Sequence, residues 1–147
     1  MAVNPLQGAS AADDMLCLAL HAASRAMTGR YRTLLNPFGV TYPQYLVLLV
    51  LQQDGPSSLV SIGDQLRLES STLSPLVRRL EAQGVVTRTR STTDERAVTI
   101  ELTSHGVTLC DQLAVVPKQA SDATGMGRPA QARLAAELHQ LEVRLRD

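Results

Sequence analysis

The chain has 147 residues, 44% of them hydrophobic, which suits a domain with a buried core and excludes an intrinsically disordered protein. Lys and Arg number 14 and Asp and Glu number 14, so the formal net charge is zero and charge alone predicts no general attraction to nucleic acid. No apolar run is long enough to span a bilayer, and residues 1–12 lack the basic start and apolar stretch of a signal peptide. We therefore expect a cytoplasmic protein without membrane attachment.

The N-terminal third predicts a flexible arm and two helices. Residues 1–12 are small and polar, which is typical of a frayed arm. Residues 13–36 carry apolar side chains at helical spacing around much of the circumference, as in a helix buried on more than one side. A second helix is expected to begin after Thr41, because Thr41 and Gln44 have the spacing of a capping box, and to end near Gln53.

Residues 59–102 have the order helix, helix, hairpin. The apolar pattern predicts a short helix at 59–66 and a second helix at 71–84, which a serine caps and a glycine ends. Residues 85–90 and 97–102 alternate and are rich in β-branched side chains, so they predict two strands joined by a polar turn. This order predicts a winged helix-turn-helix, whose second helix enters the major groove of DNA.

Short polar side chains and arginines lie where such a fold meets DNA. Residues 78–96 hold five arginines against three acidic residues, a local net charge of 5 − 3 = +2. Guanidinium groups bind phosphates and base edges through a planar fork of donors, and a helix N-terminus favours a phosphate. The predicted DNA-binding residues are Ser70, Ser71, Thr72, Ser74, Pro75, Arg78, Arg79, Arg88, Arg90 and Arg96. The alternative is that these arginines are merely solvated on an ordinary α+β domain.

The C-terminal part predicts further helices. A helix is expected from Thr103 or Ser104 onward, with an interruption at Pro117, and residues 121–129 read as a loop. Residues 133–146 predict a final amphipathic helix with four leucines on one face: Leu134, Leu138, Leu141 and Leu145. These leucines need a partner, so we expect the helices at 13–36 and 104–146 to form a dimer interface.

The two cysteines predict different roles. Cys110 stands at an apolar helical position and reads as a small buried hydrophobe. Cys17 is followed by Tyr31 and Tyr42, whose phenol hydroxyls can donate to a sulfur and so favour its thiolate form. A thiolate attacks hydroperoxides to give a sulfenic acid, so Cys17, Tyr31 and Tyr42 form a candidate redox-sensing site.

The hairpin and its flanks resemble the MarR family of bacterial regulators. The residues that carry this resemblance are Asp94-Glu95-Arg96 between the strands and Leu102-Thr103-Ser104-His105-Gly106 after them. The resemblance implies a mostly α (α+β) fold and a single unit over residues 13–147. It also adds Asp94 to the DNA-binding set.

A narrower resemblance is to the organic hydroperoxide resistance regulators within that family. It rests on Leu16-Cys17-Leu18-Ala19-Leu20, Thr41-Tyr42-Pro43-Gln44-Tyr45-Leu46 and Ser71-Thr72-Leu73-Ser74-Pro75-Leu76, together with Tyr31. The resemblance implies a homodimeric repressor that binds a pseudo-palindromic operator in double-stranded DNA when reduced. Oxidation of Cys17 by an organic hydroperoxide, the inducer, then releases it.

One position departs from the two-cysteine members of that group. Their resolving cysteine lies near an Ala-Thr-Gly run, and Asp122 occupies that position here. We therefore expect the oxidised Cys17 to be capped by a small cellular thiol or overoxidised, and not to bond to Cys110.

Two other functions remain open at this stage. One is a MarR-type repressor that responds to a phenolic ligand in a crevice beneath the first helix, with Cys17 only lining it. The other is a thiol peroxidase, although the sequence has no convincing resolving cysteine. The histidines and cysteines show no zinc-binding spacing, and no phosphate-binding glycine loop or catalytic triad pattern occurs, so we expect no metal, no cofactor and no enzymatic activity.

Overall fold

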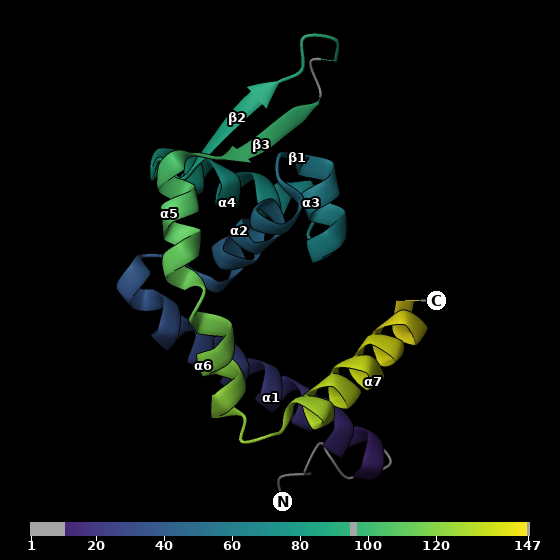
Figure 1. Cartoon of the computed structure of the whole chain (residues 1–147). Helices are drawn as coiled ribbons and strands as arrows, with labels where there is room; N and C mark the ends of the chain where they lie inside the picture. Colours follow the sequence, from purple (N-terminus) through teal and green to yellow (C-terminus); the bar gives the residue numbers. More distant parts are fainter. Residues whose placement is uncertain (1–10, 95–96, 147) are drawn as a thin grey trace, which may run out of the picture. The chain divides into compact units, whose positions relative to one another are not determined.

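The computed structural model describes residues 11–94 and 97–146, with side chains from Met15 onward (Figure 1). The chain divides into two compact units, Met1–Val116 and Pro117–Asp147. The first unit holds α1 (Ala11–Leu35), the short 3-10 helix η1 (Asn36–Phe38), α2 (Tyr42–Asp54), β1 (Ser57–Ser58), α3 (Leu59–Leu66), α4 (Ser70–Ala82), β2 (Val86–Arg90), β3 (Val98–Leu102) and α5 (Ser104–Leu113). The second holds α6 (Val116–Ala123) and α7 (Arg128–Arg146). The predicted fold class, mostly helical with a winged helix-turn-helix, is confirmed.

The turn between α1 and α2 follows local signals. Gly39 has a left-handed backbone (φ 67°), which ends η1 at little steric cost. Thr41 and Gln44 form the predicted capping box: the Gln44 N–H donates to Thr41 Oγ1 at 3.3 Å, and the Thr41 N–H donates to Gln44 Oε1 at 2.9 Å. The cap starts α2 at Tyr42, shortly after η1, and α2 packs against α1.

The helix-turn-helix is built around one buried stripe. Ser58 caps α3 by accepting the Ser61 N–H at 3.0 Å. The core between α3, α4 and the sheet includes Ile62, Leu73, Val77, Leu80, Val86 and Ile100. The N-cap of α4 is Glu69, whose side chain makes no capping bond, so the expected serine cap is wrong. Pro75 lies inside α4, in its second turn.

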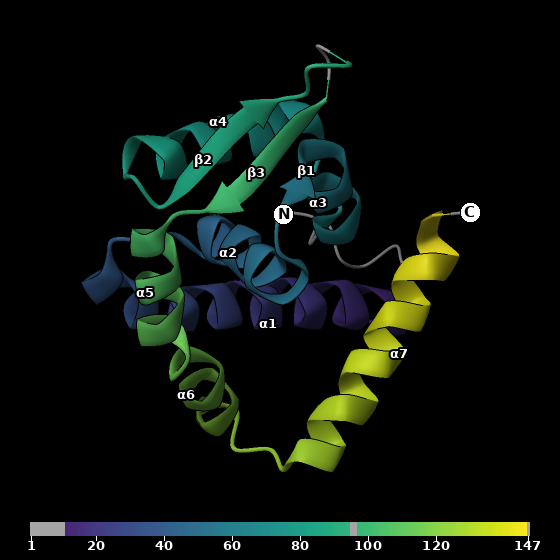
Figure 2. The same cartoon turned by 45° about the horizontal axis from the view of Figure 1, so that its top comes forward.

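The hairpin belongs to a sheet of three strands in the order β1-β3-β2, all antiparallel. In the hairpin Arg88 pairs with Ile100 and Arg90 with Val98, so the strands lie within one residue of their predicted bounds. The two-residue strand β1 was not predicted, because no alternation can be read from two serines. In Figure 2 the hairpin runs across α4 and its tip extends beyond the helices of this unit.

The start of α5 is joined tightly to the end of α4. Thr103 caps α5 by accepting the Gly106 N–H at 3.0 Å, and its hydroxyl donates to the Gly84 carbonyl at 2.6 Å. Gly106 packs so closely on the Val85 backbone that a Cβ would overlap the Val85 carbonyl oxygen. Steric overlap with Val85 therefore explains why glycine occupies this position of the Leu-Thr-x-x-Gly run.

The boundaries of the last helices differ from the prediction. Pro117 is the second residue of α6, where it fits the first turn of a helix, so the break falls before it. The predicted loop at 121–129 is too long, because α6 continues to Ala123 and α7 begins at Arg128. The predicted arm at 1–12 is two residues too long, because Ala11 and Ala12 are helical. Residues 1–10 lie outside the described part of the chain.

Among the described residues, no helix taken singly has the length and apolar character needed to cross a membrane. Only α1 and α2 together pass that test, and they are bent by 74° relative to one another.

Candidate sensing site and nucleic-acid interface

Three tyrosines from α1 and α2 form one cluster. The ring centroid of Tyr31 is 4.7 Å from that of Tyr42 and 5.8 Å from that of Tyr45, and the centroids of Tyr42 and Tyr45 are 6.5 Å apart. Aromatic rings attract one another at these distances. The packing of α2 on α1 therefore brings the predicted pair, Tyr31 and Tyr42, together. Tyr45 was not predicted as part of the site, although its spacing of three residues from Tyr42 places both on one side of α2.

All three phenols keep their protons in neutral solution. Burial raises the pKa of Tyr31. Burial raises the pKa of Tyr42 as well, and a negative charge on Tyr31 adds to the increase. For Tyr45, burial first, then charges on Tyr31, Tyr42 and Cys110, raise the pKa to about 12. The cluster is therefore a group of protonated hydroxyls, which can donate hydrogen bonds to an anion such as a thiolate.

Cys17 lies far from the phenols of its own chain. It is exposed on α1, 31 − 17 = 14 residues before Tyr31 on the same continuous helix. At a rise of about 1.5 Å per residue, ~21 Å of helix axis separates the two residues. The structure thus joins Tyr31 to Tyr42 but does not bring Cys17 to either of them within one chain. The exposed apolar side chains around it are Met15, Leu16 and Leu18.

Cys110 has the opposite environment. Its side chain is 4% exposed in α5, and it belongs to the core as expected. Burial, and to a smaller extent the charge of Asp111, raises the pKa of the Cys110 thiol. Since the thiolate is the nucleophile, this thiol is the less reactive of the pair on grounds of burial.

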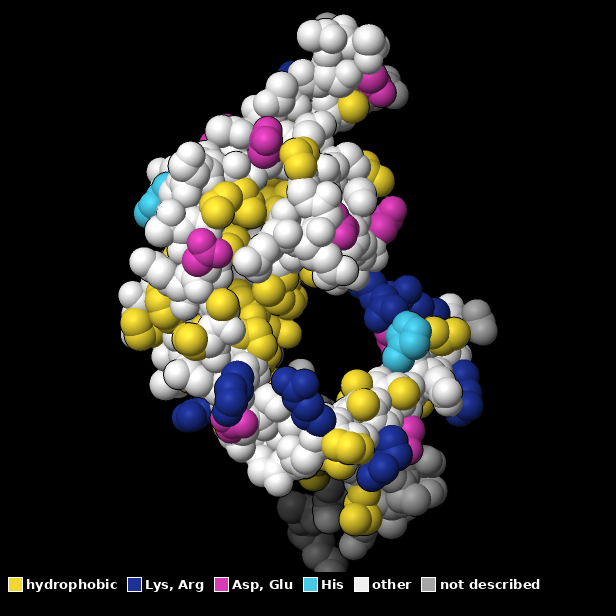
Figure 3. Space-filling view, viewed as in Figure 1, with side chains coloured by type: hydrophobic (Ala, Val, Ile, Leu, Met, Phe, Trp, Pro, Cys, Tyr) yellow, Lys and Arg dark blue, Asp and Glu magenta, His cyan; other side chains and the backbone are white. Residues whose placement is uncertain are grey.

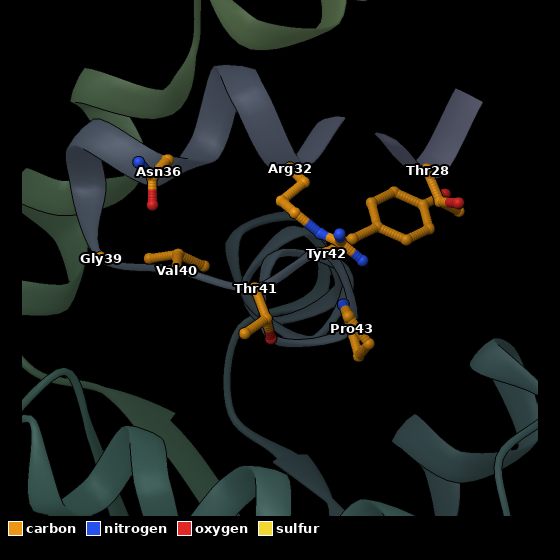
Figure 4. Close-up of a pocket in the computed structure, with 8 residues that line it drawn as sticks. All are labelled: Thr28, Arg32, Asn36, Gly39, Val40, Thr41, Tyr42 and Pro43. Atoms are coloured by element: carbon orange, nitrogen blue, oxygen red, sulfur yellow. The ribbon is translucent and has the colours of Figure 1, made fainter. Parts of the chain in front are cut away.

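A cavity of about 580 Å³ opens between the end of α1 and the start of α2 (Figure 4). It is lined by Thr28, Arg32, Asn36, Gly39, Val40, Thr41, Tyr42 and Pro43. The Arg32 side chain extends from α1 towards the start of α2, and the Tyr42 ring extends towards Thr28 (Figure 4). Tyr42 therefore belongs both to this cavity and to the tyrosine cluster. No sequence pattern predicted that Arg32 lines this cavity, apart from its position next to Tyr31.

The exposed face of α4 carries the predicted DNA-binding side chains. Leu73, Val77 and Leu80 are buried, and Ser71, Pro75 and Arg78 lie on the opposite, exposed face. The remaining predicted residues of this helix, Ser70, Thr72 and Arg79, are exposed, whereas Ser74 is half-buried. The helix therefore presents short hydroxyls near its N-terminus and two guanidinium groups farther along, an arrangement that suits base edges and phosphates.

The wing arginines differ in their exposure and in their ion pairing. Arg88 is half-buried, and its guanidinium lies 3.8 Å from a carboxylate oxygen of Glu81 in α4. Arg90, two residue pairs nearer the hairpin tip, is exposed. Asp94 is exposed in the turn, where its carbonyl accepts the Ala97 N–H at 3.0 Å, and Arg96 lies outside the described residues. Arg90 is therefore the described wing arginine most available to DNA.

Asp122, which the resemblance predicts at the place of a resolving cysteine, lies on α6 and not in a loop. Its carboxylate is 2.6 Å from the Lys118 ammonium, one turn earlier on the helix. Both side chains are exposed, so the ion pair adds little stability.

Known proteins resemble this chain in both sequence and structure. A family described as "Transcriptional regulator SarA/Rot" matches residues 30–113. The organic hydroperoxide resistance transcriptional regulator of Bacillus subtilis is 44% identical over 105 residues, which are 71% of either chain. The chain belongs to the MarR family of winged-helix transcription regulators. Within this family it is a relative of the organic hydroperoxide resistance regulators, as the Cys17 and Tyr42 motifs predicted.

Two solved structures of the regulator AbfR, from Staphylococcus epidermidis, are similar to this MarR-family chain over most of its length. Reduced AbfR bound to DNA is 35% identical, with a TM-score of 0.76 over 92% of this chain and 94% of that one. Overoxidised AbfR bound to DNA is also 35% identical, with a TM-score of 0.74 over 90% and 93%.

Proposed function

We propose that this protein is a redox-sensing transcriptional repressor. As a homodimer with reduced Cys17 it binds a pseudo-palindromic operator, and oxidation of Cys17 by an organic hydroperoxide releases it. The observation that carries the proposal is the exposed Cys17 thiol, in a chain 44% identical to an organic hydroperoxide resistance regulator and with its other thiol buried. The relatives are transcription regulators, so an enzymatic role has no support from them.

The sensing step is a two-electron transfer. The Cys17 thiolate attacks the terminal oxygen of the hydroperoxide, an S–O bond forms and the O–O bond breaks. Sulfur is oxidised to sulfenic acid, the peroxide is reduced, and the alkoxide leaves as an alcohol after taking up a proton. A phenol that keeps its proton stabilises the attacking thiolate by donating a hydrogen bond, a role for which Tyr31 and Tyr42 are suited.

Cys17 and the phenols of Tyr31 and Tyr42 lie too far apart to meet within one protomer. About 21 Å of helix separates Cys17 from Tyr31, so we propose that Cys17 of one protomer meets Tyr31 and Tyr42 of its partner. Large apolar side chains exposed around Cys17 support a contact between copies there, as do those exposed on α7: Leu134, Leu138, Val143 and Leu145. Figure 3 shows hydrophobic side chains along α7 with arginines between them.

DNA binding is assigned to α4 and the wing. In the dimer, two copies of α4 read two half-sites spaced by about one turn of the double helix. We propose that Ser71, Thr72 and Arg78 face base edges or phosphates and that Arg90 contacts the backbone from the wing. Arg88, by contrast, acts mainly by holding the wing to α4 through Glu81.

The oxidised end state is proposed to involve a second, small thiol. Cys110 is buried and Asp122 stands where a resolving cysteine lies in some relatives, so the Cys17 sulfenate has no resolving thiol on the described surface of this chain. A small cellular thiol then condenses with the sulfenate, forming a mixed disulfide and water. Mass spectrometry after one equivalent of peroxide checks this, and a Cys17–Cys110 bridge would contradict it.

The test of the proposed function is an operator gel shift with and without cumene hydroperoxide. We expect the wild type to release the operator, Cys17→Ser to hold it, and Cys110→Ser to release it like the wild type. Overoxidised AbfR has been seen bound to DNA, so each shifted sample should also be weighed by mass spectrometry to identify the state of Cys17. If the wild type stays bound with its sulfur fully oxidised, the redox proposal fails.

The second candidate function is a repressor that responds to a small ligand. The cavity of about 580 Å³ beside Tyr42 favours it, because its volume is that of a small-molecule site. In that case Cys17→Ser would still respond to the inducer. A third candidate function, that of a thiol peroxidase, would be supported by sustained peroxide turnover with a thiol reductant.

A further inference from the structure

The cavity beside Tyr42 has one charged side chain in its lining. Of the eight described residues that line it, only Arg32 carries a formal charge, and no carboxylate is among them. No described acidic residue forms an ion pair with Arg32 either. An exposed guanidinium that has no partner among the described residues keeps its five N–H donors for an incoming anion.

The neighbouring polar groups also suit an anion. No hydrogen bond of the Asn36 amide or the Tyr42 hydroxyl occurs within the described chain, so both retain a donor for a ligand. Thr28 is different, because its hydroxyl already donates to the carbonyls of Ser24 and Arg25 at 2.9 and 3.1 Å. Arg32 near the end of α1 and Asn36 at the start of η1 both line the cavity.

Apart from Thr41, the remaining described side chains of the wall are apolar. Val40, Pro43 and the Tyr42 ring also line the cavity, and the ring extends towards Thr28 (Figure 4). A ligand that fits this arrangement has a carboxylate at one end and an apolar body at the other. A carboxylate suits a guanidinium because two parallel N–H donors bind its two oxygens.

The position of the cavity ties it to the redox site. Tyr42 lines it and lies 4.7 Å, ring to ring, from Tyr31. We propose that Arg32 selects among organic hydroperoxides by binding the carboxylate of a peroxidised fatty acid, whose apolar chain then reaches the phenols. This inference rests on the proposed function, since the peroxide group reacts with the Cys17 that meets those phenols.

The test compares linoleic acid hydroperoxide with its methyl ester, which keeps the peroxide and loses the charge. We expect the acid to oxidise Cys17 at least about tenfold faster than the ester at submicellar concentration, because a charge-assisted pair is worth that much. Arg32→Gln should abolish the preference without changing the rate with the ester or with cumene hydroperoxide. Arg32→Lys should keep part of the preference for the acid over the ester.

Arg30→Gln is the matched control. Arg30 is exposed on the same helix but does not line the cavity, so its loss removes an equal charge and should leave the preference intact. Equal rates for acid and ester in the wild type, or a preference that survives Arg32→Gln, would overturn the role of Arg32 while leaving Cys17 as the sensor.

A binding measurement separates this inference from the sensing proposal. Titration calorimetry of unoxidised linoleate into Cys17→Ser should show binding that weakens at least about tenfold with Arg32→Gln added or with methyl linoleate as ligand. If linoleate binds in this way and no peroxide oxidises wild-type Cys17, the carboxylate site stands and the redox proposal fails. If linoleate and its ester bind equally, the carboxylate site is wrong.

Discussion

Cys17 and Cys110 are both helical thiols, and their surroundings separate their chemistry. Cys17 is exposed among exposed apolar side chains, whereas Cys110 is buried in the core. Cys110 and Tyr45 belong to the same hydrophobic core cluster. A reagent in solution therefore distinguishes the two sulfurs by access alone.

The first prediction concerns alkylation. We expect iodoacetamide to label Cys17 in the native protein and to leave Cys110 unlabelled, because a buried, protonated thiol is neither accessible nor nucleophilic. Peptide mass spectrometry measures both sites, and the urea-unfolded protein serves as the control in which both react. Equal native labelling of Cys110 would show that α5 opens readily.

The second prediction is a pH dependence of stability. The folded protein raises the pKa of Tyr45 from 10.0 to about 12, so between these values the unfolded chain loses the proton and the folded chain keeps it. Stability should therefore be unaffected by Tyr45 below pH 10 and fall as the pH rises from 10 towards 12. Tyr45→Phe removes the ionisable group and should lessen this fall.

Urea unfolding at pH 7 and at pH 11 measures this loss of stability for the wild type and for Tyr45→Phe. Tyr31→Phe is the comparison, because burial raises that pKa less far. If wild type and Tyr45→Phe lose the same stability on going to pH 11, the Tyr45 hydroxyl is not held in its neutral form.

At the scale of elements, caps and glycines decide where helices end. The joint between α4 and α5 uses both, since Thr103 caps α5 while holding Gly84, and Gly106 allows α5 to lie against Val85. The proposed DNA-reading helix, α4, is thereby fixed to α5, which carries Cys110.

The third prediction tests that joint. Gly106→Ala should destabilise the fold by about 1–3 kcal/mol, because the new methyl group overlaps the Val85 carbonyl and the backbone must shift. Gly29→Ala is the control: Gly29 is also helical, nothing lies within 4 Å of its Cβ position, and alanine there should stabilise α1 by up to about 1 kcal/mol. Urea denaturation measures both, and an unchanged Gly106→Ala midpoint would mean that the joint is loose.

Local signals predicted most elements, and contacts across elements were harder. The Thr41 box, Gly84 and the alternating strands act within a few residues, so the second helix, the helix-turn-helix and the wing were predicted to within two residues. Strand β1 exists only because β3 pairs with it. The end of α6 was missed because Gly125 and the residues around it suggested a loop that begins too early.

In the candidate site, too, residues placed by contacts between elements were harder to predict than residues within a local motif. Tyr31 and Tyr42 were predicted together from a family motif, and they lie together. Neither Tyr45 nor Arg32 was predicted, because their place depends on how α2 is rotated against α1. The separation of Cys17 from the phenols follows from helix geometry, but only once α1 is known to be unbroken.

At the scale of the whole molecule, a neutral chain must bind a polyanion through local charge. The net charge is zero, so association with DNA gains little long-range attraction, and we propose that it depends on the arginines of α4 and the wing.

The fourth prediction is a change in salt dependence. Each phosphate contact contributes about −0.9 to the slope of log affinity against log salt, so loss of one contact in each of two protomers should reduce the slope by about 2. We expect this of Arg90→Gln in operator titrations by fluorescence anisotropy. Arg128→Gln, in the C-terminal unit, removes the same charge and should leave the slope unchanged. A uniform loss of affinity with an unchanged slope would remove Arg90 from the phosphate contacts.

The tyrosine cluster also makes the protein its own spectroscopic probe. The chain has three tyrosines and no tryptophan, and all three tyrosines lie in one cluster. Nearly all the near-ultraviolet absorbance and fluorescence of the chain thus arises at one place, beside the cavity that Arg32 lines. Circular dichroism in that band follows the geometry of these rings, so it can follow peroxide or fatty acid in real time without a label or an engineered reporter.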